Sequence, residues 1–343
     1  MFDRVCLNPL TWLDITAYSA PGENTIQFSQ CIRSWGGNEC VLATIPLADA
    51  CKMNVEDLRD LPSAKKAREQ VVSRGLTDWC ATCPRLREGQ SPTMLCGEVN
   101  WDSLPSTWTI LNLAYDKSCN LACPSCRPFP ILWKPCDEQY DMLMEFQDRI
   151  IRPLLKQANT ACLAGLGDPF GSPVYRHLLE TLNPEDAPTL GWHIQTNGVG
   201  FTPDQLGRIP TRTQINSVQF SIDAAKPKTY RVVRGNHWKV VNDNLRFAGH
   251  LRQSGFISQL AISMVIQECN WGEMVDFYRL GRHVGCDIVQ FNALLNQHTY
   301  SEEDYKARAV HLSGHPVQPK FMKVCDEMRA WTEPRVLLEF PRD

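Results

Sequence analysis

The densest group of chemically active side chains in this sequence is a set of three cysteines in the stretch DKSCNLACPSCRP, residues 116–128. Cys119, Cys123 and Cys126 follow one another at x3 and x2 spacing, so three potential thiolate ligands share one short loop. Thiolates at this density are typical of zinc sites and iron–sulfur clusters. A closed zinc site requires four ligands and a disulfide requires two, so a set of three leaves one coordination position to be explained.

Structural zinc is one interpretation of this loop. Such sites usually have two well separated Cys-x2-Cys pairs, whereas this loop has a single x2 spacing and no nearby fourth cysteine or histidine. Cys136 is the nearest candidate, and it opens the next helical segment. The other interpretation is a four-iron cluster in which three cysteines hold three irons and the fourth iron binds a small molecule.

Regular elements must position this loop, and from residue 108 onward apolar runs alternate with amphipathic segments. Six runs have strand character, at residues 108–115, 160–166, 191–197, 217–223, 260–267 and 288–295. Helical periodicity lies between them, at residues 137–157, 173–182, 204–209, 238–255 and 271–285. This alternation predicts parallel strands with right-handed crossovers. We therefore expect an α/β fold, a partial (β/α)6 TIM-like barrel over residues 108–300, with chemistry at the carboxyl ends of the strands.

The motif CNLACPSC at residues 119–126 resembles the signature of the radical S-adenosylmethionine superfamily. The resemblance implies that the amino and carboxylate groups of S-adenosylmethionine chelate the open iron of the 4Fe-4S cluster. It also implies that the reduced cluster cleaves S-adenosylmethionine to methionine and a 5′-deoxyadenosyl radical, which abstracts hydrogen from the substrate.

The resemblance extends to about residue 296 and implies further cofactor-binding residues at the strand ends. The segment AGLGDPF is similar to the family's Gly-Gly-Glu-Pro segment, which implies that Gly165, Gly167 and Asp168 approach the methionine amino group. The segments QTNG and FSIDA end the third and fourth strands, and they place Asn197, Ser221 and Asp223 at the cofactor, the last two at the ribose hydroxyls. Arg234 is placed like the family arginine that binds the methionine carboxylate, for which its planar fork is suited.

Several positions depart from the family pattern or admit a plainer interpretation. Asp168 replaces the commoner glutamate and Leu166 interrupts the glycines, so backbone oxygens are an alternative contact for the amino group. Ser125 stands where many members carry an aromatic residue that packs on adenine. GLGDP read alone is a simple turn, and Arg234 read alone is a surface arginine.

Residues 1–107 are irregular and rich in Cys, Pro and Gly, with one helical segment at residues 54–75. They resemble the SPASM/twitch accessory module, which implies a second, auxiliary 4Fe-4S cluster on Cys6, Cys31, Cys80 and Cys83. The module usually follows the radical domain, whereas here it precedes it. A competing assignment has Cys40 or Cys96 in place of Cys6 as a cluster ligand. A zinc ribbon at Cys80 and Cys83 is the simpler alternative to an auxiliary cluster.

An auxiliary cluster that accepts an electron would suit oxidation or dehydrogenation of a small molecule, sugar-like or another natural product. Epimerisation would instead require a thiol that returns hydrogen, and Cys269 after the fifth strand is the candidate. Cys162 and Cys286 are expected in the core, and Cys325 lies in a helical extension at residues 301–343. A peptide-modifying maturase and a non-catalytic iron–sulfur or zinc protein on the same scaffold are the alternatives.

Composition excludes some partners. The formal charge of −3, from 35 basic and 38 acidic residues, predicts no non-specific nucleic-acid binding. No apolar stretch approaches the roughly 18 residues of a membrane span, and fifteen cysteines without a secretory signal favour reduced thiolates in a cytoplasmic protein. The expected partners are a small-molecule substrate and a reducing electron donor such as flavodoxin or ferredoxin.

Overall fold

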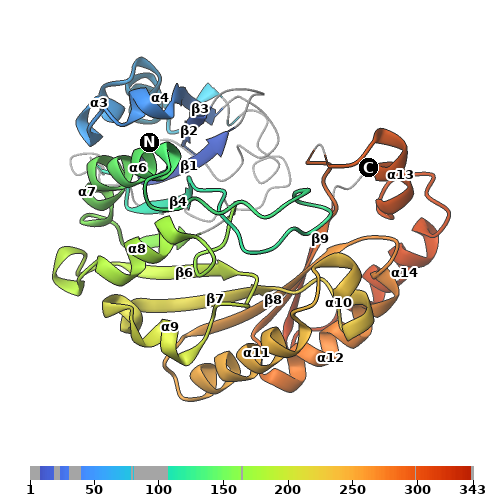
Figure 1. The fold of residues 1–343 in the computed structure, drawn as a ribbon. Helices are drawn as coiled ribbons and strands as arrows, with labels where there is room; N and C mark the ends of the chain where they lie inside the picture. Colours follow the sequence, from blue (N-terminus) through green and yellow to red (C-terminus); the bar gives the residue numbers. More distant parts are fainter. Residues whose placement is uncertain are drawn as a thin grey trace. The chain divides into compact units, whose positions relative to one another are not determined.

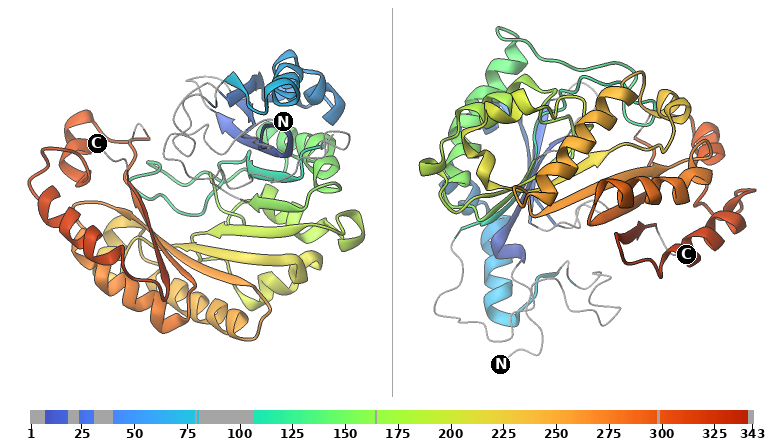
Figure 2. Two further views of the ribbon diagram at one scale, coloured as in Figure 1. Left: turned by 180° about the vertical axis from the view of Figure 1, so that it is seen from behind. Right: turned by 90° about the horizontal axis from the view of Figure 1, so that it is seen from below.

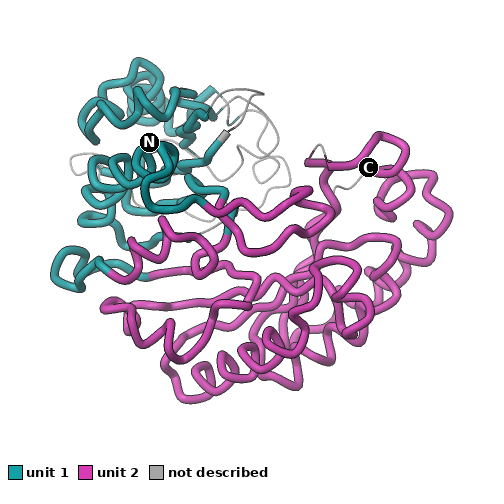
Figure 3. Tube along the Cα trace, viewed as in Figure 1, with its two compact units in different colours: residues 1–117, 133–167, 181–191 teal, residues 118–132, 168–180, 192–343 magenta. Residues whose placement is uncertain are grey.

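The computed structural model describes residues 8–18, 24–30, 40–78, 80, 107–163, 165–297 and 299–340. The chain divides into two compact units, which Figure 3 shows in different colours. The first unit contains residues 1–117, 133–167 and 181–191, and the second contains residues 118–132, 168–180 and 192–343. None of the helices in these described ranges is long and apolar enough to cross a membrane.

The first unit is built on strands in the order β5-β4-β1-β2-β3. β4 (Ile110–Ala114) and β5 (Thr160–Leu163) are parallel and confirm the first two predicted strands. β1 (Trp12–Tyr18) pairs in parallel with β4, and β2 (Thr25–Ser29) and β3 (Val41–Pro46) continue from it in antiparallel pairs. Sequence analysis missed these three strands, although Leu13 and Ile15 in β1 are fully buried and alternate with polar residues.

The predicted helix at residues 54–75 is confirmed as two helices that meet at a proline. Asn54 caps α3 (Val55–Asp60) in a capping box with Asp57, and α4 (Pro62–Arg74) begins at its proline. Gly75 ends α4 in the left-handed conformation, at φ +76°. Two single-turn helices precede this region in the chain, α1 (Asn8–Thr11) and α2 (Leu47–Ala50).

The predicted helix at residues 137–157 is also confirmed, with a π-helical interruption. It consists of α6 (Glu138–Phe146), the π-turn η5 (Gln147–Ile151) and α7 (Arg152–Leu155). Phe146 packs against Phe28 and Tyr115, with ring centroids 6.3 and 5.8 Å away. A 3-10 turn, η6 (Pro184–Asp186), completes the described elements of this unit.

The second unit carries parallel strands in the order β6-β7-β8-β9-β10. β6 (Gly191–Thr196), β7 (Ile215–Ser221), β8 (Gln259–Ile266) and β9 (Ile288–Ala293) confirm the other four predicted strands. β10 (Arg335–Glu339) was not predicted, and it extends the sheet by pairing with β9. Parallel strands separated by helices confirm the α/β class.

Helices and 3-10 turns connect the strands of the second unit. They are α8 (Pro173–Thr181), α9 (Pro203–Gly207), η7 (Pro210–Gln214), α10 (Pro227–Val233), α11 (Trp238–Gln253), η8 (Trp271–Glu273), α12 (Met274–Val284), α13 (Glu302–Arg308) and α14 (Gln318–Met328). Figures 1 and 2 show α11 and α12 along one face of β7–β9. Contacts of α11 with β8 and of α12 with β9 fix the helices there.

Tight packing holds α12 against this sheet. A Cβ added at Gly281 would lie 2.6 Å from a side-chain carbon of Val289 and 3.0 Å from one of Ile262, so only glycine allows the helix to approach this closely. Phe277 of α12 meets Phe291 of β9 edge to face, with ring centroids 5.8 Å apart. The core of the second unit therefore lies between these helices and one face of its strands.

Candidate functional site

The predicted cluster loop belongs to the second unit and is held by backbone hydrogen bonds. The N–H of Cys119 donates to the carbonyl of Ile131 at 2.7 Å, which closes the loop into a bridge. The N–H groups of Cys126 and Arg127 donate to the carbonyl of Cys123 at 2.8 and 3.0 Å. Cys119 and Cys123 are each 8% exposed, whereas Cys126 is exposed. The structure therefore places two of the three thiols inside the loop and one at its surface.

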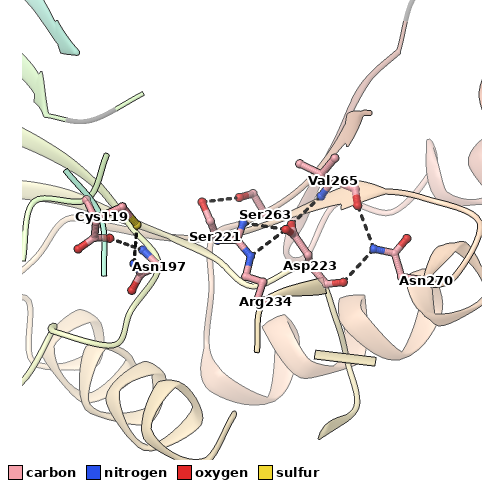
Figure 4. A network of polar contacts seen from close by, with 9 residues as sticks. Cys119, Asn197, Ser221, Asp223, Arg234, Ser263, Val265 and Asn270 are labelled. Carbon is pink, nitrogen blue, oxygen red and sulfur yellow. Dashed lines mark hydrogen bonds and ion pairs between the residues drawn. The ribbon is translucent and has the colours of Figure 1, made fainter. Parts of the chain in front are cut away.

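Nitrogen donors surround the sulfurs at both ends of the motif. The backbone N–H of Leu121 donates to Cys119 Sγ at 3.4 Å, and Asn197 Nδ2 lies 3.6 Å from the same sulfur (Figure 4). Arg127 Nε and Nη2 both lie 3.4 Å from Cys126 Sγ. Because a metal-bound cysteine is a thiolate, N–H donors directed at its sulfur stabilise the charge that binding creates.

The chemistry of the donor set, three thiols supplied with N–H donors, suits a four-iron cluster. Within the described ranges, no three His, Cys, Asp or Glu side chains are arranged to hold one ion, as structural zinc would require. A four-iron cluster differs because each cysteine binds its own iron, so the thiolates need not converge on one point. Burial raises the pKa of Cys119 to about 11, with Asp168 adding to it, and burial also raises the pKa of Cys123. Cluster binding must therefore displace protons from these thiols.

Asp168 follows β5 in the sequence, and its buried carboxylate accepts hydrogen bonds from groups of the protein itself. It is 1% exposed and accepts four hydrogen bonds. The N–H groups of Phe170 and Gly171 donate to Oδ1 at 3.0 and 2.9 Å. Thr196 Oγ1 and the N–H of Asn197 donate to Oδ2 at 2.9 and 2.7 Å. With two donors on each oxygen, the carboxylate ties its own turn to the end of β6, and its contact with the methionine amino group stays a prediction.

Asp168 and Asn197 also connect this turn to the cysteine loop. The N–H of Asp168 donates to the carbonyl of Ser118 at 2.9 Å, directly before the first cysteine. Asn197 Nδ2 donates to Asn120 Oδ1 at 2.8 Å as well as approaching Cys119 Sγ. The structure thus brings two of the predicted cofactor-binding residues to the predicted cluster ligands.

Asp223 and Arg234 form a buried ion pair, which Figure 4 shows beside the end of β8. Arg234 Nη2 and Nε lie 2.7 and 2.8 Å from Asp223 Oδ2, and the Arg234 and Asp223 side chains are 12% and 3% exposed. The N–H of Val265 donates to Asp223 Oδ1 at 2.8 Å. Asn270 Nδ2 donates to the carbonyls of Asp223 and Val265, both at 2.9 Å. Asp223 adopts a φ of +62°, a left-handed conformation that these contacts maintain.

Charge and burial act in opposite directions on Arg234. Burial lowers the pKa of its guanidinium, while Asp223, Cys123 and Tyr230 raise it, and the net pKa lies above the usual value. The guanidinium also lowers the pKa of Cys123, which places the two groups within electrostatic reach of each other. At the neighbouring strand end, Ser263 Oγ donates to Ser221 Oγ at 3.4 Å. The predicted ribose-binding residues and Arg234 therefore lie together in one polar network.

Cys269 lies in the turn after β8, next to Asn270 of this network. The residue as a whole is exposed, but its thiol is partly desolvated, which raises its pKa, and Asp223 contributes in the same direction. Its hydrogen-donor role stays a prediction. Gly165 and Gly167 belong to the first unit, Gly167 with a φ of +72°, and their contact with the methionine amino group also stays a prediction.

The auxiliary-cluster assignment falls largely on undescribed residues. Cys6, Cys31 and Cys83 lie outside the described residues, as does Cys96. Cys80 is buried, and its sulfur lies 3.2 Å from Thr77 Oγ1. Cys51, a further cysteine of this region, donates from its sulfur to the carbonyl of Met142 at 3.2 Å. The auxiliary cluster stays a prediction.

Of the cysteines expected in the core, Cys286 is buried and Cys162 is half-buried, and Cys325 of the C-terminal extension is also buried. Burial raises the pKa of Cys286 and Cys325 to about 12 and that of Cys162 to about 11. These thiols are therefore poorly suited to reaction as thiolates.

Sequence reasoning missed Arg127, Thr196 and Asn270. Arg127 could have been found, because it directly follows the third cysteine and a cation at that position must lie near the sulfurs. Thr196 and Asn270 carry no local signal. Their partners, Asp168 and Asp223, are 28 and 47 residues away in the sequence.

No family model matches the chain, and no curated protein sequence matches it. Solved structures resemble it at low identity. Streptococcus suis SuiB bound to S-adenosylmethionine has a TM-score of 0.44 and 11% identity, over 69% of this chain and 51% of SuiB. The structure of anSMEcpe with bound AdoMet has a TM-score of 0.46 and 15% identity, over 67% of this chain and 63% of the other. TYW1 with a lysine-pyruvate adduct has a TM-score of 0.41 and 13% identity, over 64% of this chain and 71% of TYW1.

The chain thus spans about half the length of the SuiB chain that it matches.

Proposed function

We propose that the chain is a radical S-adenosylmethionine enzyme whose 4Fe-4S cluster is bound by Cys119, Cys123 and Cys126. The observation that carries this proposal is the loop itself, in which three cysteines are supplied with N–H donors from Leu121, Asn197 and Arg127. When bound and reduced, such a cluster supplies the electron that cleaves S-adenosylmethionine and begins hydrogen abstraction from the substrate.

The chain's own residues would bind and orient the cofactor. Arg234, held by Asp223, presents a cation for the methionine carboxylate. Ser221, beside Asp223, offers a hydroxyl for the ribose. Asn197 and the Asp168 turn would position the methionine end next to Cys119, with Gly165 and Gly167 allowing close approach of the backbone. Each group has a chemical type that suits its proposed partner.

Oxidation or epimerisation of a small molecule is the substrate chemistry we favour, with Cys269 as the hydrogen donor for epimerisation. Peptide modification stands beside it as the alternative. Two of the proteins named above also have structures with peptides, SuiB with the precursor peptide SuiA and anSMEcpe with the Cp18Cys peptide.

The remaining parts of the proposal follow from the redox chemistry. A donor such as flavodoxin or ferredoxin would reduce the cluster, and a reducing cytoplasmic compartment would keep fifteen cysteines as thiols. An auxiliary 4Fe-4S cluster on Cys6, Cys31, Cys80 and Cys83 would accept the electron left after hydrogen abstraction.

The test compares the wild type with the triple variant Cys119→Ala, Cys123→Ala, Cys126→Ala after anaerobic reconstitution. We expect about eight irons in the wild type and about four in the variant, with 5′-deoxyadenosine released under reducing conditions only by the wild type. Cys136→Ala is the matched control, since it removes a thiol from the same stretch of sequence and should change neither readout. A wild type that takes up iron but releases no 5′-deoxyadenosine would contradict the proposed activity and favour a non-catalytic protein.

A further inference from the structure

Arg127 directs its guanidinium at the sulfur of the residue that precedes it. Its Nε and Nη2 both donate to Cys126 Sγ at 3.4 Å, so the Nε–Nη2 edge of the guanidinium faces the sulfur. Arg127 is 8% exposed, and a cation at this degree of burial requires anionic or strongly polar partners. The proposed ligand sulfur is one of those partners.

We propose that Arg127 raises the reduction potential of the cluster at Cys119, Cys123 and Cys126, through its two hydrogen bonds to Cys126 Sγ and its charge. This inference rests on the proposed function. In the reduction, a low-potential donor such as dithionite gives one electron to the oxidised [4Fe-4S]²⁺ cluster, which becomes [4Fe-4S]¹⁺ without a proton. The reduced cluster and its thiolates carry one more negative charge, so a nearby cation stabilises the reduced form more than the oxidised one.

Asn197 provides a second and weaker donor at the other end of the motif. Its Nδ2 lies 3.6 Å from Cys119 Sγ and 2.8 Å from Asn120 Oδ1, so it donates mainly to the oxygen. It is also uncharged. Cys126 Sγ therefore has the stronger side-chain donor, Arg127, and Cys119 Sγ the weaker one, Asn197. Removal of Arg127 should change the reduction potential more than removal of Asn197.

The experiment is a redox titration of the reconstituted full chain, with the electron paramagnetic resonance signal of the reduced cluster as the readout. The variants are Arg127→Gln and Arg127→Lys, with Arg231→Gln as the matched control, because Arg231 is exposed on α10. We expect Arg127→Gln to lower the ratio of reduced to oxidised cluster about tenfold at a fixed potential. For one electron this is a shift of about 59 mV toward more negative potential.

Arg127→Lys should shift the potential in the same direction by less, because lysine keeps the charge but cannot place two donors on one sulfur. The control variant should titrate like the wild type. If Arg127→Gln does not retain iron, Arg127→Lys carries the test, and a potential equal to that of the wild type would overturn the inference.

Two results separate this inference from the proposed function. A cluster that forms normally and has one potential in the wild type and both Arg127 variants would overturn the inference alone. Weaker S-adenosylmethionine binding in Arg127→Gln at an unchanged potential would also overturn it, and would make Arg127 a ligand-binding residue. A wild type that takes up no cluster at the three cysteines would overturn the proposed function and the inference together.

Discussion

The variant Asp168→Asn tests whether the turn after β5 depends on a carboxylate. The wild-type side chain accepts two bonds on each oxygen, from Phe170 and Gly171 on Oδ1 and from Thr196 and Asn197 on Oδ2. Asparagine keeps one oxygen acceptor and puts an NH2 group where the other oxygen was. The hydroxyl of Thr196 can turn to accept from that group, but the backbone N–H of Asn197 then faces another donor.

The magnitude follows from these contacts. One buried N–H left unsatisfied costs about 1–3 kcal/mol, and the bonds that remain lose the strength that the carboxylate charge gave them. We therefore expect the free energy of unfolding to fall by about 3 kcal/mol, measured by urea denaturation at neutral pH. Cluster retention should fall as well, because Asp168 holds Ser118 and Asn197 beside Cys119.

The matched control is Glu327→Gln, which neutralises an exposed carboxylate on α14 and should change the unfolding free energy by less than about 0.5 kcal/mol. Thr196→Val removes one of the four donors, so its loss of unfolding free energy should lie between those of Asp168→Asn and Glu327→Gln. A loss below about 1 kcal/mol for Asp168→Asn would refute the reasoning, since the four bonds would then carry little of the stability assigned to them.

Two further predictions concern charged pairs of the second unit. Burial raises the pKa of Asp287, but its bonds from Arg252 at 2.7 and 2.8 Å and from the N–H of Leu260 lower it more, so the net pKa is depressed. The stabilisation by Asp287 is thus present above the unfolded pKa of about 3.9 and is lost as pH falls through the lower folded pKa. Asp287→Asn should lower the free energy of unfolding by about 1 kcal/mol at pH 7. As the pH is lowered to 3, the melting curves of the variant and the wild type should converge. A difference in melting temperature that stays constant with pH would contradict this. Arg234→Lys keeps a cation beside Asp223 but loses the planar fork, so calorimetry should show S-adenosylmethionine bound about tenfold more weakly, and an unchanged Kd would remove Arg234 from the site.

Much of the fold could be predicted because the six strands and the helices between them carry their own periodicity. β1 and β10 were missed, although Leu13 and Ile15 give β1 the apolar alternation of a strand. β1 joins β4 across almost a hundred residues of chain, with Trp12 opposite Ile110, and no local pattern shows that pairing. β10 is a short apolar run near the chain end whose strand character depends on β9 being available as a partner.

The cysteine loop of the candidate site could be predicted because the spacing of its residues determines its chemistry. The hydrogen-bond and ion-pair partners of the other side chains could not, because they depend on the tertiary structure. The x3 and x2 spacing is enough to place three cysteines on one loop. Spacing does not show that both carboxylate oxygens of Asp168 accept hydrogen bonds from the protein itself, because the four donors come from two separate segments of the chain. It also does not show that Asp223 and Arg234 bind each other, since they are eleven positions apart in the sequence and either could have faced solvent.

The contacts that fix Asp223 have a consequence for ligand affinity. Val265 and Asn270 hold this residue, and Asp223 in turn fixes the guanidinium of Arg234. A solvent-exposed arginine loses about 2 kcal/mol of rotamer entropy when a ligand immobilises it. Arg234 has already lost most of that freedom on folding, so the site is preorganised, and a carboxylate that binds there meets a donor that does not have to be ordered first.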